Sequence, residues 1–183
     1  MDNQQRGEVT WAKVEKISSE LFTLTYGALI TQMLKDLDNP VEVNAQLEKM
    51  GYNIGIRLID DFLANSGAGK CHTLKDTADV IAKVAFKAFL GVTASVSSFD
   101  EKKQEFTLLL EDNPLADFVE LPEEYKDTLI YSNILCGVIR GALEMVQMRV
   151  ECSFTKDALR GDDITELKVH LIEIMKEDMP SDE

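Results

Sequence analysis

Residues 129–155 read LIYSNILCGVIRGALEMVQMRVECSFT, and within this stretch the spacing of the apolar residues changes. Apolar side chains occupy most sides of the segment up to Met145, which predicts a central buried helix from Leu129 to Met145. From Met148 onwards apolar and polar residues alternate, as is typical of a strand with one buried face. A buried helix followed by a half-buried strand favours an α+β fold, with helices packed on one face of a small antiparallel sheet.

The alternating pattern predicts three further strands, which gives a sheet of about four. One follows a turn at Gly161 and carries Leu167, Val169 and Leu171 on its buried side. The other two, at residues 106–110 and 118–121, are expected to form a hairpin around the turn at 112–114. The serine-rich segment near residue 97 is expected to be a loop.

Three helices are predicted before the first strand, each from a start signal. Ser18 caps the first, and Asn39 caps the second with a proline directly after it. Thr73 caps the third, with Asp76 three residues later completing a capping box. Glycines one turn apart, at 51 and 55 in the second helix and at 137 and 141 in the central one, are expected to permit close helix packing.

The chain of 183 residues is expected to comprise three regions. Residues 1–17 are mostly polar and read as a flexible leader. Residues 18–175 are expected to form a single α+β domain, which is long enough to bury a substantial core. Residues 176–183 read as an acidic tail.

The composition excludes several classes of protein. With 19 basic and 33 acidic residues the formal charge is -14, which disfavours binding to nucleic acid phosphates. Three scattered cysteines are too few for a disulfide framework or a zinc site, and a reducing cytoplasmic environment is the default expectation. The most apolar stretch contains Arg140 and Glu144, so it is expected to be a buried helix and not a membrane span.

No complete catalytic motif is visible, and we expect no enzymatic activity. Gly69-Lys70 resembles the end of a phosphate-binding loop, but Ala64 and Cys71 stand where that loop needs Gly and Ser or Thr. Cys71 and His72 are adjacent in sequence, a placement that rarely gives a nucleophile and its base the required geometry. The two histidines and three cysteines also lack the spacing of a metal site.

Cys71 differs from the other two cysteines in its position. It lies in a glycine-rich loop beside Lys70 and just before a predicted helix, where positive charge and the helix dipole would favour the thiolate. This makes Cys71 the strongest candidate nucleophile. The alternative is that it is simply another buried cysteine, as Cys136 and Cys152 are expected to be.

The third predicted helix, which begins just after Cys71, has one broad face of small and aromatic residues. This face comprises Ala78, Ile81, Ala82, Ala85, Phe86 and Phe89. It could pack against another helix, or its alanines could leave an elongated apolar slot that starts near Cys71. The residues themselves leave both interpretations open.

Five long segments resemble one known family, in order and at compatible spacing from residue 18 onwards. They are SSELFTLTYGAL (18–29), NIGIRLIDDFL (53–63), TADVIAKVAFK (77–87), NPLADFVELP (113–122) and YSNILCGVIRGALEMV (131–146). The chain resembles the third small subunit family of the transport protein particle (TRAPP) complex.

The resemblance implies a non-catalytic, cytoplasmic subunit of a complex that tethers vesicles between the endoplasmic reticulum and the cis-Golgi. That complex promotes nucleotide exchange on a Rab GTPase, and the subunit would form homodimers or heterodimers with related subunits. Family members carry a palmitoyl chain, thioester-linked to a loop cysteine and held in an internal apolar channel. Here the matching cysteine is Cys71, and the resemblance favours the slot over simple helix packing.

One departure and one alternative accompany the resemblance. The family is associated with a cationic face for peripheral membrane contact, and the acidic charge of this chain argues against a simple form of it. The alternative function is a stand-alone lipid or small-molecule binding domain, because 4-vinyl-reductase-type ligand domains are similar in fold. Co-purification with other TRAPP subunits would discriminate between the two.

Overall fold

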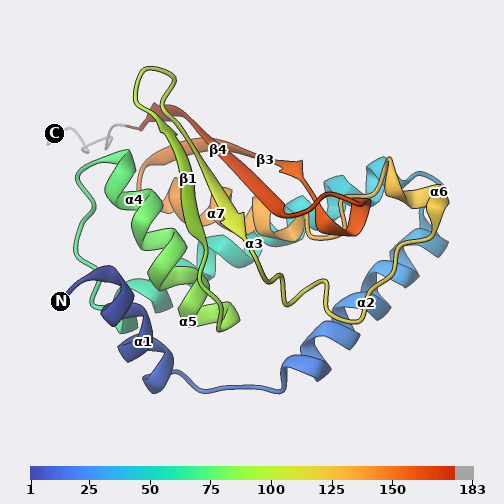
Figure 1. Cartoon of the computed structure of the whole chain (residues 1–183), viewed down its shortest axis with the longest axis horizontal. Helices are drawn as coiled ribbons and strands as arrows, with labels where there is room; N and C mark the ends of the chain where they lie inside the picture. The colour runs from blue at the N-terminus through green and yellow to red at the C-terminus, as the bar shows by residue number, and fades with distance from the viewer. Residues whose placement is uncertain (176–183) are drawn as a thin grey trace, which may run out of the picture.

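The computed structural model describes residues 1–175, so the expected acidic tail at 176–183 lies outside the described residues. A layer of helices covers one face of a four-stranded antiparallel sheet, which confirms the predicted α+β class (Figure 1). The strands are β1 (Ser95–Asp100), β2 (Glu105–Leu110), β3 (Met148–Lys156) and β4 (Thr165–Ile174), in the spatial order β1-β2-β4-β3. Short helices α6 (Glu123–Lys126) and η2 (Ala158–Arg160) lie in the connections.

The long helices are α2 (Ser19–Asp36), α3 (Pro40–Ser66) and α7 (Ile134–Met145). A further helix runs continuously through α4 (Leu74–Val80), a π-helical segment η1 (Ile81–Ala85) and α5 (Phe86–Leu90). The predicted caps are confirmed, since side-chain oxygens of Ser18, Asn39 and Thr73 each accept a backbone N–H of the helix that follows.

The buried face of the sheet is the one predicted from the alternation of apolar and polar residues along the strands. Phe106 pairs with Val169 and Leu108 pairs with Leu167 across β2 and β4, and all four side chains are almost fully buried. These residues form the main core together with the inner sides of α7 and α4.

Helices α3 and α7 pack with their backbones in contact, as the paired glycines predicted. A Cβ atom on Gly51 would lie 2.0 Å from the carbonyl oxygen of Ile134, and one on Gly137 would lie 2.0 Å from that of Glu48. Any larger residue at these positions would force the two helices apart.

The expected flexible leader at 1–17 is wrong for most of its length, because residues Asn3–Lys13 form helix α1. This helix lies against η1 and α5, where Gly7 approaches the carbonyl oxygen of Lys83 and Glu8 pairs with Lys87 at 3.1 Å. Its buried positions are Gly7 and Thr10, so its docking face carries almost no apolar signal that periodicity could detect.

The expected hairpin between 106–110 and 118–121 is also wrong. The antiparallel partner of β2 on that side is β1, which lies in the serine-rich segment, and Phe99 pairs with Phe106. A register shift between Val96 and Ser98 interrupts the alternation of β1. Phe118 has φ 63, a left-handed conformation that an extended strand does not adopt.

The central helix begins at Ile134 and not at Leu129. The side chain of Asn44 donates to the carbonyl of Thr128 at 2.7 Å and accepts from the N–H of Ile130 at 2.8 Å. These backbone groups are therefore bonded to α3 and are not available for a helical ladder, which delays the start of α7.

Candidate functional site

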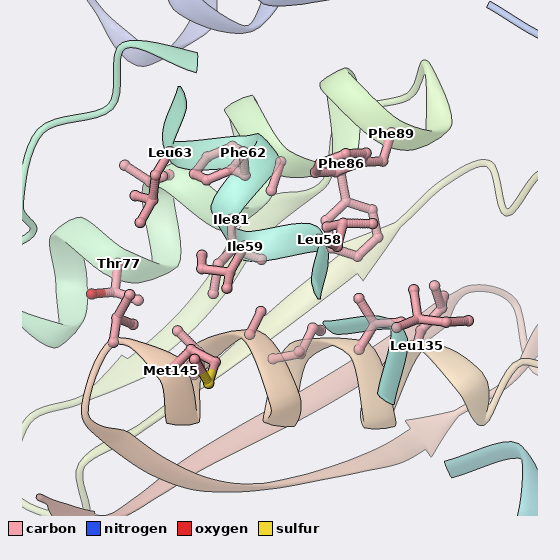
Figure 2. Close-up of a pocket in the computed structure, with 18 of the residues that line it drawn as sticks. Leu58, Ile59, Phe62, Leu63, Thr77, Ile81, Phe86, Phe89, Leu135 and Met145 are labelled. Atoms are coloured by element: carbon pink, nitrogen blue, oxygen red, sulfur yellow. The ribbon is translucent and has the colours of Figure 1, made fainter. Parts of the chain in front are cut away.

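An apolar cavity of about 1030 Å³ lies between α3, α7 and the continuous helix α4-η1-α5. Figure 2 shows side chains from these helices converging on it, with α7 on one side and α3 and α4-η1-α5 on the other. The volume is at the upper end of the roughly 300–1,000 Å³ typical of small-molecule sites. The arrangement can enclose a long apolar ligand.

The π-helical segment η1 decides which residues face the cavity. Thr77, Ile81, Ala85 and Phe89 recur every four residues and all line it. In an α-helix this spacing drifts around the axis, but the wider π-turn offsets the drift and keeps the four on one side. The π-turn thus gives the cavity one continuous wall.

Four of the six residues predicted to line a slot do so, namely Ile81, Ala85, Phe86 and Phe89. Ala78 and Ala82 do not line the cavity. Both have 0% exposure and pack in the main core on the sheet side of the same helix. The prediction failed for them because it assumed regular α-helical steps through a segment that is π-helical.

The other walls come from helices that sequence reasoning did not connect with a site. From α3 they include Leu58, Ile59, Phe62 and Leu63, and from α7 they include Leu135, Ile139, Ala142 and Met145. Ile54 and Leu63 remain more than 40% exposed, although both lie on a helix already in contact with α7. The sequence of α3 contains more apolar residues than one packing face needs, and this excess could have indicated that the helix also lines a site.

Cys71 lines the cavity, in the loop that also contributes residues 68–70 and His72 to the lining. The thiol is half-buried and close to the hydroxyl of Thr77, the first cavity-lining residue of α4. The structure therefore brings the candidate nucleophile together with the apolar wall that follows it.

The expectation of a favoured thiolate at Cys71 is wrong. Burial is the largest effect and raises the pKa of the thiol, and the nearby Asp76 carboxylate also raises it. A hydrogen bond with Thr77 and the Arg6 guanidinium both lower the pKa, but by less. Burial outweighs the local positive charge, because loss of solvent penalises the charged form. Cys71 is thus a thiol with a raised pKa that lines an apolar cavity.

The other two cysteines belong to the core, as predicted. Cys136 is buried on α7 and Cys152 packs against the core from β3. Burial raises the pKa of Cys152 well above its usual value, and a hydrogen bond with Cys136 adds to the effect. Neither side chain lines the cavity.

Other kinds of site find little support within residues 1–175. No cluster of His, Cys, Asp or Glu there could hold a metal ion. His170 lies beside Glu105 and Glu151 on the sheet, apart from Cys71 and His72. Within the same residues, no helix combines the length and apolar character needed to cross a membrane.

Comparison with known proteins adds independent findings. Residues 22–170 match the family model described as transport protein particle (TRAPP) component. The chain is 60% identical over 174 residues to "Trafficking protein particle complex subunit 3" of Dictyostelium discoideum, covering 95% of this chain and 94% of that protein. It is 52% identical over 180 residues to "Transport protein particle subunit bet3" of Schizosaccharomyces pombe, covering 98% of each.

A solved structure is also similar. It is the trafficking protein particle complex subunit 3 of Naegleria fowleri covalently bound to palmitic acid, with a TM-score of 0.85 and 55% identity. The match covers 89% of this chain and 100% of that one. With the family match and these identities, the chain described here belongs to the transport protein particle (TRAPP) component family.

Proposed function

We propose that this chain is a non-catalytic core subunit of a TRAPP complex that holds a palmitoyl chain, thioester-linked to Cys71, in its apolar cavity. The observation that carries the proposal is a free, half-buried thiol that lines an apolar cavity of about 1030 Å³. The palmitic acid bound covalently to the similar Naegleria fowleri protein supports it.

The cavity offers a strong driving force for holding such a chain. Burial of about fifteen methylene and methyl groups at about 0.8 kcal/mol each gives a gross gain near 12 kcal/mol. This is an upper limit, because chain ordering and any alternative apolar environment reduce it. The acyl group would therefore act as part of the hydrophobic core and stabilise the fold.

In the cell the subunit would contribute to vesicle tethering between the endoplasmic reticulum and the Golgi, and to assembly of the complex that exchanges nucleotide on a Rab GTPase. The names of the relatives, as subunits of a trafficking particle complex, support this role. We expect a cytoplasmic protein that contacts the cis-Golgi and endoplasmic reticulum membranes peripherally. The Rab GTPase would be bound only by the assembled complex.

The exposed apolar side chains of α2 support self-association or pairing with a related subunit. Leu21 and Leu24 are 65% and 63% exposed, and Phe22 on the same helix is partly exposed at the cavity. A second copy or a related subunit would bury this apolar surplus, and a two-fold contact is the usual solution.

The proposal is tested by affinity purification of the tagged chain from a eukaryotic cell. Recovery of further TRAPP subunits together with a hydroxylamine-labile acyl group on the chain is the expected result. Recovery of the chain alone with a free lipid or small molecule would favour the alternative, a stand-alone binding domain. We also expect the isolated chain not to accelerate nucleotide release from the Rab, and saturable acceleration would contradict a non-catalytic role.

A further inference from the structure

The cavity is larger than one palmitoyl chain requires. Sixteen carbon groups of about the volume of a water molecule in the liquid, ~30 Å³ each, would fill ~480 Å³. That is about half of the 1030 Å³ available. The lining continues to α2 and to Leu115, so the apolar space is not closed where a sixteen-carbon chain would fill it. A limit on the length of the bound chain would therefore have to come from side chains inside the cavity.

The helix α4-η1-α5 provides a length scale from the attachment point. Thr77 is next to the Cys71 thiol, and Phe86 and Phe89 follow it by nine and twelve residues. At about 1.5 Å per residue, these two lie about 13 and 18 Å further along the axis. In a fluid bilayer an acyl chain spans about 15 Å on average, half of the roughly 30 Å hydrocarbon core. A sixteen-carbon chain starting at Cys71 would thus reach the level of Phe86.

Three side chains stand at this level. Figure 2 shows Phe86, Leu58 and Leu135 on the side of the cavity away from Thr77 and Met145. Phe86 is 5% exposed and belongs to the main core, and Leu135 is 7% exposed, so surrounding atoms hold both in place. The backbone N–H of Phe86 donates to the carbonyl of Ile81, which closes the π-turn and fixes where this residue begins α5.

We propose that Phe86, Leu58 and Leu135 form a stop that limits the acyl chain on Cys71 to about sixteen carbons. Of the three, Leu58 is the residue whose truncation would let a longer chain pass. Leu58 is part of neither buried core cluster, so truncating it widens the passage at modest cost to the fold. The apolar space beyond the stop would then accept a longer saturated chain. This inference rests on the proposed acylation of Cys71.

The test compares Leu58→Ala with Leu63→Ala. Both leucines are on α3 and line the cavity, and Figure 2 shows Leu63 at the opposite end from Leu58, so the second variant is a matched control. Each protein is produced in a eukaryotic host supplied with equal amounts of sixteen-, eighteen- and twenty-carbon saturated fatty acids. The acyl groups are identified by intact mass and after release with hydroxylamine. Leu58→Val, a smaller truncation, is included in case Leu58→Ala does not fold.

In Leu58→Ala we expect the ratio of eighteen- to sixteen-carbon chains to rise by up to about 14-fold over wild type, since two further methylenes gain burial. Leu58→Val should give a smaller rise, and Leu63→Ala should match wild type. The inference is overturned if both Leu58 variants keep the wild-type ratio, or if Leu63→Ala raises it equally. Wild-type protein without any acyl group would overturn the proposed function as well, which distinguishes the two failures.

Discussion

The close packing of α3 against α7 predicts that Gly137→Ala lowers the stability of the protein, although replacing Gly by Ala normally stabilises a helix. A methyl group added at Gly137 would place its Cβ 2.0 Å from the carbonyl oxygen of Glu48 and 2.7 Å from the N–H nitrogen of Tyr52. Both atoms belong to the backbone of α3, so no side chain can rotate out of the way. The two helices would have to separate by more than about 1 Å, and a close-packed interior resists such a shift.

Two opposing effects set the magnitude of Gly137→Ala. In a helix without this contact, replacing Gly by Ala would stabilise the protein by roughly 1 kcal/mol, through propensity alone. Overpacking typically costs 1–3 kcal/mol and can cost more, and a backbone-on-backbone clash is at the upper end. We therefore expect a net loss of about 2 kcal/mol, which lowers Tm by about 4–8 °C for a domain of this size.

The assay is thermal unfolding followed by far-UV circular dichroism, on proteins freed of any acyl group with hydroxylamine. Gly69→Ala is the control, because no atom lies within 4 Å of a Cβ added there and the residue is in a loop. Its Tm should stay close to that of wild type. A Gly137→Ala protein as stable as wild type, or more stable, would refute the close contact between the helices.

Three further predictions concern the cavity and the surface. Ala85→Leu should fill part of the cavity and lower the fraction of acylated protein. The stability should change by less than about 1.5 kcal/mol, because the new side chain occupies existing space. Undiminished acylation would show that Ala85 does not line the space that the acyl chain occupies. In acyl-free protein, burial should move the pH midpoint of iodoacetamide reaction at Cys71 above that of a cysteine in an unstructured peptide, since only the thiolate reacts and the pKa is raised. Thr77→Val should move this midpoint further up, because it removes a hydrogen bond that lowers the pKa, and a midpoint at or below the peptide value would contradict the burial. The isolated chain should scatter light as a dimer at micromolar concentration, and a monomeric mass throughout would count against self-association.

The sequence was sufficient for the elements whose signals are local. The strands β3 and β4 alternate cleanly, and the caps at Ser18, Asn39 and Thr73 depend on residues within one turn. It was insufficient where distant contacts decide the structure. Helix α1 is held by a glycine against the carbonyl of Lys83, and β1 is an edge strand whose alternation is broken by a bulge.

The candidate site was also predictable only where it depends on local sequence signals. The sequence identified Cys71 and the helix that follows, but regular helical steps placed Ala78 and Ala82 beside Ala85 when the π-turn separates them. It also overestimated the effect of Lys70 on the Cys71 thiol, because burial of the loop depends on tertiary packing. The walls from α3 and α7 required knowing how these helices are arranged in space.

The most direct test of Cys71 acylation is the intact mass of the chain purified from a eukaryotic host, before and after hydroxylamine. We predict a mass increase equal to one palmitoyl group that hydroxylamine removes, present in wild type and in the core variants Cys136→Ser and Cys152→Ser, and absent in Cys71→Ser. Acylated wild type should also unfold at a higher temperature than the hydroxylamine-treated protein, since the chain fills the cavity. An unmodified wild-type mass, or an acyl group that persists in Cys71→Ser, would contradict acylation at Cys71.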